Sequence, residues 1–165
     1  IGTRFWVETP VKEGADDLAK LRSEEKPDQL KPLSGMRILV VEDNRMNTYV
    51  LGKFLSRWDV KFDVAEQGIQ ALELLSANAY DLVLMDIQMP EMDGYETTRQ
   101  LRQKGLKMPV FALTANVFAE VKDKVFEAGM NDYISKPFNP TQLYTKISSV
   151  YKDPRDKKPV NLTLF

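Results

Sequence analysis

The chain has 165 residues, of which 43% are hydrophobic and 28% are charged, values typical of one globular domain with additional chain at its ends. Its 23 lysines and arginines are balanced by 24 aspartates and glutamates, which argues against sequence-independent binding of nucleic acid. The absence of cysteine and histidine excludes disulfides, thiolate metal sites, imidazole bases and a phosphohistidine on this chain.

The first 35 residues predict a strand followed by a linker. Residues 1–11 contain aromatic and β-branched residues before a proline, which predicts one strand. Residues 12–35 include 11 charged residues and are interrupted by prolines, so they offer too few apolar residues for a core. We therefore expect a charged linker over residues 12–35, a packed domain over residues 36–151 and a tail over residues 152–165.

The segment 36–151 alternates between short apolar stretches and amphipathic stretches. The apolar stretches predict strands over residues 37–41, 61–65, 81–86, 109–113 and 133–134. Apolar residues at helical spacing predict helices over residues 45–58, 69–75, 95–102, 117–128 and 143–150. We expect Asn44 to cap the first helix and Gly129 to end the fourth in a left-handed conformation. This alternation predicts an α/β fold, in which helices cover both faces of a parallel sheet.

Five polar residues follow the predicted strands. Glu42 and Asp43 come after the first strand, Asp86 ends the third, Thr114 follows the fourth and Lys136 follows the fifth. In an open parallel sheet, functional groups gather beyond the carboxyl ends of the strands. We therefore expect these five side chains to converge at one edge of the sheet.

A cluster of three carboxylates predicts a cation site, because the negative charges repel one another unless a cation lies between them. Oxygen ligands suit Mg²⁺, with Mn²⁺ as a substitute. A carboxylate can attack a phosphoryl group, and Lys136 can neutralise phosphoryl oxygens. The predicted chemistry is therefore the formation of an aspartyl phosphate on Asp86.

Taken singly, each of these residues has an ordinary structural alternative. An isolated Asp86 is more often a turn or cap residue, an isolated Lys136 is more often a surface lysine, and Thr114 is more often structural. Their coincidence at one edge of the sheet favours function. We expect the methionines to serve packing, not cofactor binding; these are Met85, Met89, Met92 and Met108.

Several motifs in this order resemble those of response-regulator receiver domains, in particular receivers attached to hybrid sensor histidine kinases. The motifs are Glu42-Asp43-Asn44, the stretch from Asp86 through Gln-Met-Pro to Gly94, Ala-Leu-Thr114-Ala-Asn116, and Tyr133-Ile-Ser-Lys136-Pro137. The resemblance covers roughly residues 36–151. It implies a three-layer, flavodoxin-like, doubly wound fold with strand order 2-1-3-4-5 and five helices.

The resemblance also assigns roles to individual residues. It implies that Asp86 is the phosphoacceptor and that Thr114 and Lys136 bind the phosphoryl oxygens. The implied Mg²⁺ ligands are Glu42, Asp43, Asp86 and the backbone carbonyl of Gln88. Tyr133 would be a rotamer switch coupled to Thr114, and the Lys136–Pro137 peptide bond would be cis. Gln88 and Asn116 are expected to flank the route of hydrolytic water.

The opening residues 1–11 resemble the last strand of a histidine-kinase ATP-binding domain. This implies a hybrid histidine kinase as the parent protein, whereas the receiver itself would catalyse only its own phosphoryl transfer and dephosphorylation. The implied partners are a dimerisation and phosphotransfer domain, a separate histidine phosphotransfer protein, and the kinase core of the same protein. We expect a cytoplasmic monomer that does not bind nucleic acid. We also expect no contact of this fragment with a membrane, since no apolar run approaches the about 20 residues of a membrane span. The parent protein could still be anchored in a membrane.

Two alternative functions remain open from the sequence. A Mg²⁺-dependent phosphohydrolase with an aspartyl intermediate would favour a second acid two residues beyond Asp86, where this chain has Gln88. A docking module that is never phosphorylated would not need the complete set of site residues.

The acidic pair after the first strand is Glu42-Asp43, whereas Asp-Asp is commoner in receiver domains. The longer glutamate side chain affects the geometry and the affinity expected of the metal site.

Overall fold

The structure is a computed structural model and describes residues 30–116 and 118–153. The strand expected over residues 1–11, most of the linker and most of the tail lie outside the described residues. The elements are β1 (Arg37–Val41), α2 (Arg45–Arg57), β2 (Lys61–Ala65), α3 (Gly68–Ala77), β3 (Leu82–Asp86), α4 (Gly94–Gln103), β4 (Val110–Thr114), α5 (Ala119–Glu127), β5 (Asp132–Ser135) and α6 (Pro140–Val150). These ranges match the predicted strands and helices to within a few residues, except that Val117 is not described.

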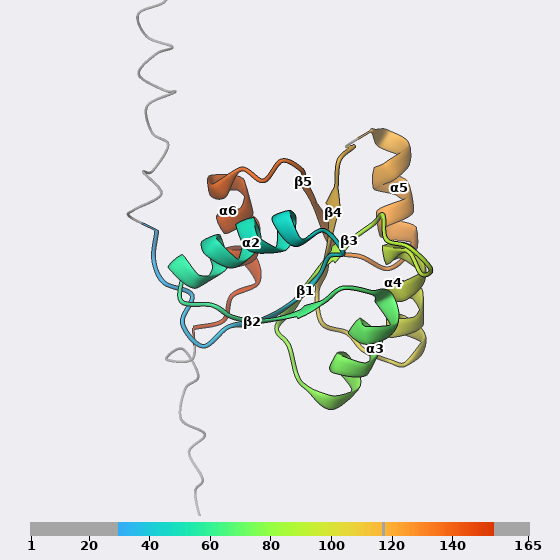
Figure 1. The fold of residues 1–165 in the computed structure, drawn as a ribbon, viewed down its shortest axis with the longest axis horizontal. Coiled ribbons are helices and arrows are strands. Elements are labelled where there is room, and N and C mark those ends of the chain that lie inside the picture. The colour runs from blue at the N-terminus through green and yellow to red at the C-terminus, as the bar shows by residue number, and fades with distance from the viewer. Residues whose placement is uncertain (1–29, 117, 154–165) are drawn as a thin grey trace, which may run out of the picture.

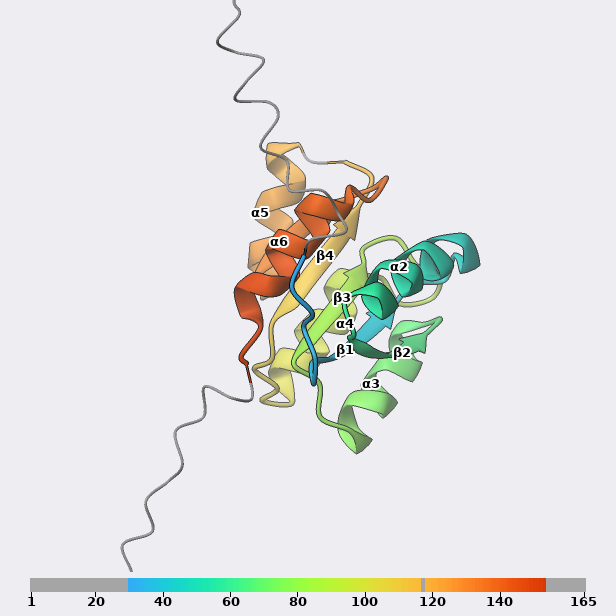
Figure 2. The ribbon, with the colours of Figure 1, turned by 90° about the vertical axis from the view of Figure 1, so that its left-hand side faces the viewer.

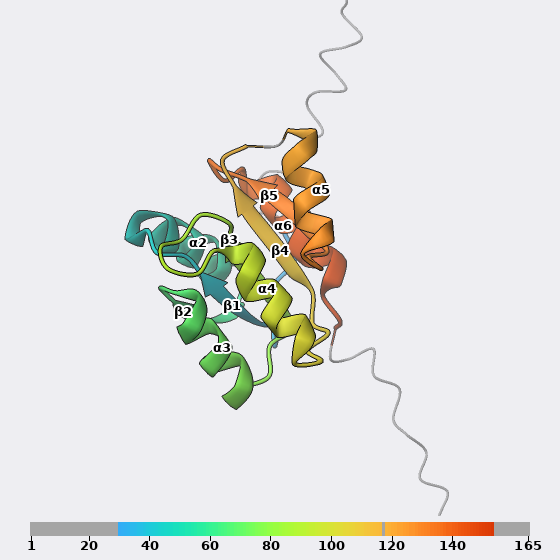
Figure 3. The same ribbon diagram turned by 90° about the vertical axis from the view of Figure 1, so that its right-hand side faces the viewer.

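The strands form a single parallel sheet in the order β2-β1-β3-β4-β5, which confirms the predicted topology. Helices α2 and α6 cover one face, and helices α3, α4 and α5 cover the other (Figure 1). Figure 3 shows the second of these faces, with the three helices lying across the strands. The fold is therefore the predicted three-layer α/β arrangement.

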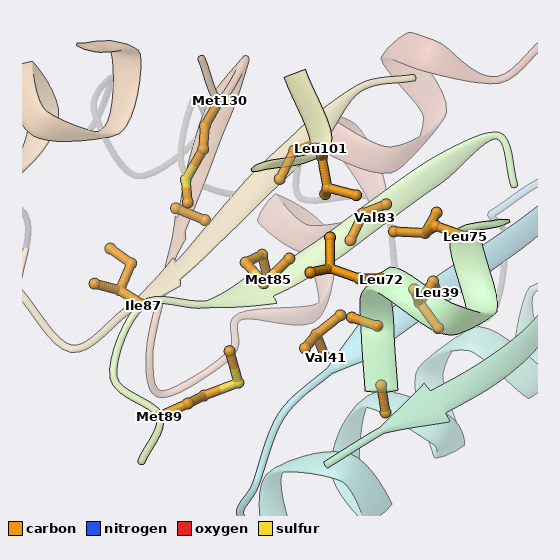
Figure 4. Close-up of a cluster of buried hydrophobic side chains, with 14 of the residues drawn as sticks. Leu39, Val41, Leu72, Leu75, Val83, Met85, Ile87, Met89, Leu101 and Met130 are labelled. Carbon is orange, nitrogen blue, oxygen red and sulfur yellow. The ribbon is translucent and has the colours of Figure 1, made fainter. Parts of the chain in front are cut away.

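Each face of the sheet has its own hydrophobic core, because successive residues of a strand point to opposite faces. Leu39, Val41, Val83 and Met85 contribute to the core beneath α3, α4 and α5 (Figure 4). Their neighbours along β1 and β3 contribute to the core beneath α2 and α6. The three central strands, β1, β3 and β4, are buried on both faces, which explains why their sequences are almost continuously apolar.

The four methionines serve packing, as predicted. Met85 and Met89 are buried in the core beneath α3, α4 and α5, where Figure 4 shows both side chains. Met92 and Met108 are partly buried and pack against the same cluster.

Two predicted helix signals are confirmed. The side chain of Asn44 accepts hydrogen bonds from the backbone N–H groups of Met46 and Asn47, so it caps α2. Gly129 follows the end of α5 with a φ of 88°, the left-handed conformation that glycine adopts without a Cβ penalty.

The packed body begins before the predicted boundary at residue 36. Leu33 is buried in the core beneath α2 and α6, and its backbone N–H donates to the carbonyl of Trp58 at 2.7 Å. We call residues 30–35 the lead-in segment; Figure 2 shows it running alongside α6 before β1. The hydroxyl groups of Tyr144 and Tyr151 donate to the carbonyls of Lys31 and Ser34, both at 2.9 Å. The lead-in segment is therefore part of the folded domain.

Candidate functional site

The candidate site lies at the carboxyl end of the sheet. Glu42 and Asp43 directly follow β1, and Asp86 is the last residue of β3. These strands are adjacent and pair Val41 with Met85, so the acidic residues leave the sheet at the same level. The topology thus brings together side chains that are 44 positions apart in the sequence.

Three carboxylates converge at this edge. One oxygen from each of Glu42, Asp43 and Asp86 can be chosen so that all three lie within 4.8 Å of one another. Glu42 and Asp86 are buried, whereas Asp43 is exposed. The cluster therefore opens to solvent on the side of Asp43, from which an ion could reach it.

Lys136 joins two of these carboxylates. Its Nζ lies 2.7 Å from Oε2 of Glu42 and 2.8 Å from Oδ2 of Asp86. The lysine follows β5 at the far side of the sheet, so its side chain reaches across the end of β4 to the acids of β1 and β3. The predicted convergence of Lys136 with the acidic cluster is observed. The peptide bond between Lys136 and Pro137 is cis.

The two oxygens of Glu42 have different surroundings. Oε1 accepts a hydrogen bond from the side-chain amide of Asn47 at 3.0 Å and from the backbone N–H of Asn44 at 3.3 Å. Oε2 is buried and forms a charge pair with the ammonium of Lys136; within the described residues no hydrogen bond to it has acceptable geometry. Burial raises the pKa of Glu42 above its ordinary value, and the neighbouring Lys136 ammonium and Asn47 amide oppose that rise.

The donor set fits a hard divalent cation. Three carboxylates supply oxygen ligands only, which is the preference of Mg²⁺ and not of softer metals. The buried Oε2 of Glu42, whose charge partner is the Lys136 ammonium, gains a second positive partner when a cation shares the cluster. Asp86 is further oriented because its Oδ1 accepts the backbone N–H of Gln88 at 3.2 Å.

Thr114 ends β4 directly after Leu113, which pairs with Asp86 of β3, and it lines a small pocket. The pocket has a volume of about 290 Å³, and its lining includes Gln88, Asp93, Thr114 and Asn116. The hydroxyl of Thr114 donates to the carbonyl of Asn116 at 2.8 Å and accepts from its N–H at 3.1 Å. In this structure the hydroxyl is thus bonded within its own loop.

Tyr133 is partly buried on β5, next to the strand that ends at Thr114. Two ammonium groups lie near its ring, Lys122 Nζ of α5 at 5.2 Å and Lys146 Nζ of α6 at 5.0 Å from the centroid. Asp132 holds Lys146 at 2.6 Å and also accepts the backbone N–H of Tyr133. The ring therefore sits between two helices that each place a positive charge beside it.

Sequence reasoning missed two residues that shape the site. Asn47 bonds the buried Glu42, a contact that its position three residues after the cap Asn44 could have suggested. Gly94 begins α4 against the backbone of Asp86, so that a Cβ there would overlap the Asp86 carbonyl oxygen. No local pattern of residues indicates that close approach, because it depends on how the loop after β3 returns to the strand.

Comparisons with known proteins agree with this geometry. Residues 38–148 match the family model of the response regulator receiver domain. The autoinducer 2 sensor kinase/phosphatase LuxQ of Vibrio parahaemolyticus is 39% identical over 146 residues, which cover 87% of this chain and 17% of that protein. The chain therefore spans about a sixth of the length of this curated relative.

Solved structures are similar in fold and sequence. One of them is the receiver domain of a sensor histidine kinase from Pseudomonas aeruginosa PAO1, solved with a magnesium ion in its active site cleft. It is 37% identical to this chain with a TM-score of 0.65, and the match covers 72% of this chain and 98% of that one. A chain of the co-crystal structure of the Saccharomyces cerevisiae phosphotransfer protein Ypd1 and the receiver domain of Ssk1 is 30% identical with a TM-score of 0.68, and the match covers 74% of this chain and 92% of that one.

Within the described residues, none of the helices has the length and apolar character needed to cross a membrane.

Proposed function

The chain belongs to the response regulator receiver family, whose members act in phosphorelays, and we propose that Asp86 is the residue that accepts the phosphoryl group. One observation carries this proposal: Lys136 lies within 2.8 Å of Asp86 and 2.7 Å of Glu42, inside a cluster of three carboxylates. A lysine held in this way presents a positive charge beside the carboxylate that would become phosphorylated.

The proposed reaction is a direct transfer from a phosphohistidine of another domain or protein. An oxygen of the Asp86 carboxylate bonds to phosphorus while the bond between phosphorus and the imidazole nitrogen breaks, and the imidazole leaves with that electron pair. Asp86 needs no general base, because its carboxylate is the nucleophile in the ionised form. Lys136 and Thr114 would bind the phosphoryl oxygens.

The residues that would hold Mg²⁺ are Glu42, Asp43, Asp86 and the backbone carbonyl of Gln88, and Mn²⁺ would substitute. When bound, the ion neutralises phosphoryl oxygens and so reduces their repulsion by the acidic cluster. The buried Oε2 of Glu42, which accepts no well-directed hydrogen bond from the described residues, and the oxygen-only donor set support this assignment.

A phosphoryl group on Asp86 would change the surroundings of Thr114 and Tyr133. It adds a charge of about −1.5 to −2, which favours rotation of the Thr114 hydroxyl away from Asn116 and toward the new oxygens. Space vacated near Thr114 would allow the Tyr133 ring to move, with Lys122 and Lys146 moving or reorienting beside it. Gln88 and Asn116 line the same pocket as Thr114 and are placed to influence hydrolytic water.

The wider organisation is also proposed. Residues 1–11 would be the terminal strand of a kinase ATP-binding domain, residues 12–35 a linker whose last part packs on the receiver, and residues 152–165 a tail. The partners would be the kinase core of the same protein and a histidine phosphotransfer domain or protein. The similarity to a receiver bound in a phosphotransfer complex supports a partner of this class.

Incubation with Mg²⁺ and acetyl phosphate, followed by intact mass measurement, tests the proposal. We expect one phosphoryl group per chain in the wild type and none in Asp86→Asn, while Asp123→Asn, an exposed acid on α5, behaves as the wild type. The adduct should be cleaved by hydroxylamine, as an acyl phosphate is. Uptake of one phosphoryl group by Asp86→Asn would overturn the proposal. Sustained release of phosphate would favour the phosphohydrolase alternative, and no uptake by the wild type would favour the docking module.

A further inference from the structure

We infer that Asn47 is a positioning residue for the cation site: it fixes the orientation of the Glu42 carboxylate, so that one of its oxygens faces the acidic cluster. The inference rests on the Mg²⁺ site of the proposed function, in which Asn47 would touch neither the phosphoryl group nor the cation. Asn47 acts through Glu42 alone.

Asn47 is held firmly at the start of α2. It is the third residue of the helix, and its backbone N–H donates to the side chain of the cap residue Asn44 at 3.3 Å. From this position its side-chain amide donates to Oε1 of Glu42 at 3.0 Å. The backbone N–H of Asn44 donates to the same oxygen. Two donors from one helix start therefore bind one oxygen of a glutamate that lies on the preceding loop.

This arrangement leaves the other oxygen for the cluster. Oε2 of Glu42 is buried, accepts no well-directed hydrogen bond, and lies 2.7 Å from the ammonium of Lys136. A carboxylate free to turn partway about its terminal bond would point neither oxygen directly at the cluster. The amide of Asn47 removes that freedom, because rotation would break its hydrogen bond in a buried site.

The length of the Glu42 side chain makes such an orienting contact necessary. Glutamate has one more rotatable bond than aspartate, so a buried glutamate in an acidic pair has more orientations to restrict. Partners that orient metal-binding carboxylates typically change metal affinity by about 10–100-fold when they are removed. A residue that only satisfied a buried oxygen would affect the stability of the fold, but it would not act on cation affinity specifically.

The test is a Mg²⁺ titration of the full 165-residue chain, followed by ¹H–¹⁵N NMR. We expect Asn47→Ala to weaken Mg²⁺ binding about tenfold. Asn47→Leu, which keeps the size of the side chain but lacks the donor, should weaken it similarly. Thr48→Ala is the matched control: its hydroxyl bonds the carbonyl of Asn44 on the same helix turn without contacting Glu42, and Mg²⁺ affinity should change less than twofold.

A second titration tests whether the effect passes through the Glu42 carboxylate. In a Glu42→Gln background, adding Asn47→Ala should change Mg²⁺ affinity less than twofold, because the oriented charge is already absent. In the wild type, the side-chain amide signals of Asn47 should shift on addition of Mg²⁺. Equal Mg²⁺ affinity of the wild type and Asn47→Ala, or an undiminished effect of Asn47→Ala in the Glu42→Gln background, would overturn the inference.

The outcomes separate this inference from the proposed function. If the wild type binds Mg²⁺ and accepts a phosphoryl group but Asn47→Ala binds Mg²⁺ equally well, only the inference fails. If the wild type binds Mg²⁺ with the expected dependence on Asn47 but takes up no phosphoryl group, the inference stands and the proposed function fails. Absence of Mg²⁺ binding by the wild type would overturn both.

Discussion

Lys136 pairs with a Glu42 carboxylate that has no exposed side-chain surface, and the distance between Nζ and Oε2 is 2.7 Å. The same ammonium lies 2.8 Å from Asp86, so the lysine is shared by two buried carboxylates, which also lie close to the Asp43 carboxylate. Lysine is therefore the resident positive charge of an otherwise acidic site. Its removal should expose the repulsion that it offsets.

We predict that Lys136→Met lowers the free energy of unfolding by about 3 kcal/mol in the absence of divalent cations, because it leaves buried carboxylates without a counter-charge. Saturating Mg²⁺ should recover part of this loss, since an ion that binds only the folded state stabilises it. Urea unfolding with and without Mg²⁺ measures both effects. Lys107→Met, an exposed lysine outside the site, should change stability little under either condition. A deficit for Lys136→Met that Mg²⁺ does not reduce would contradict the shared-cation account.

Gly94→Ala should damage both stability and phosphorylation. A Cβ at this position would overlap the backbone carbonyl oxygen of Asp86, so the end of β3 must move to admit it. We expect a loss of about 2–4 kcal/mol in urea unfolding, in the range of overpacked or strained core positions, and slower uptake of the phosphoryl group from acetyl phosphate.

Gly105→Ala is the control for Gly94→Ala. Gly105 has a φ of 78°, but a Cβ there would meet no atom of residues 30–116 or 118–153 within 4 Å, so only backbone strain is added. The expected cost is about 1 kcal/mol, with phosphorylation unchanged. Equal effects of the two substitutions would mean that contact with Asp86 is not what matters at Gly94.

Leu33→Ala should destabilise the domain even though residue 33 lies in the segment predicted as a linker. The side chain is 2% exposed in the core beneath α2 and α6, and truncation of a buried leucine typically costs about 2–5 kcal/mol. Urea unfolding followed by tryptophan fluorescence measures the change, because Trp58 is buried in the same core as Leu33. The exposed Pro32→Ala offers a neighbouring control. Unfolding free energies of Leu33→Ala and wild type within 0.5 kcal/mol of each other, roughly the spread of surface substitutions, would contradict the packing described above.

The stability of the domain should depend on Asp63 at acid pH. Donation from Arg37, and to a lesser degree from the Tyr80 hydroxyl, lowers the pKa of Asp63 below its ordinary value. The stabilisation is therefore fully present above the ordinary value of about 4 and is lost as pH falls through the lowered value. Because the pair with Arg37 is partly exposed, we expect Asp63→Asn to cost only about 0.5–1 kcal/mol at neutral pH.

Urea unfolding of both proteins at neutral pH and at a pH below the ordinary carboxyl range checks this prediction. The difference between the wild type and Asp63→Asn should shrink at the lower pH, since the wild-type carboxyl is then protonated in both states. A difference that grows as the pH falls would show that the sign is wrong.

The sequence predicted the fold because its local signals agree with one another. Continuous apolar strands, the cap at Asn44 and the left-handed Gly129 are set by residues within a few positions, and the structure has all three. The convergence of Glu42, Asp86 and Lys136 was also predictable, because the parallel sheet brings every strand end to one edge.

Other features depend on packing between distant segments and left no local signal. Leu33 lies among charged and proline residues, so its burial against α2 and α6 could not be seen from composition. The two lysines beside Tyr133 come from different helices, and their meeting depends on how α5 and α6 flank β5. The contact of Gly94 with Asp86 depends on the path of the intervening loop.

The lead-in segment also has a mechanical consequence. Its contacts with Trp58, which ends α2 just before β2, and with Tyr151 lie toward the amino ends of the strands, because residues 36, 81 and 109, which line a hollow together with Tyr151, each precede a strand. Tension applied to the chain before residue 30 would therefore be borne by α6 and the end of α2. The loop that carries Glu42 and Asp43 is at the opposite edge, so a pull from upstream would reach it only after the anchorage at Leu33 had given way.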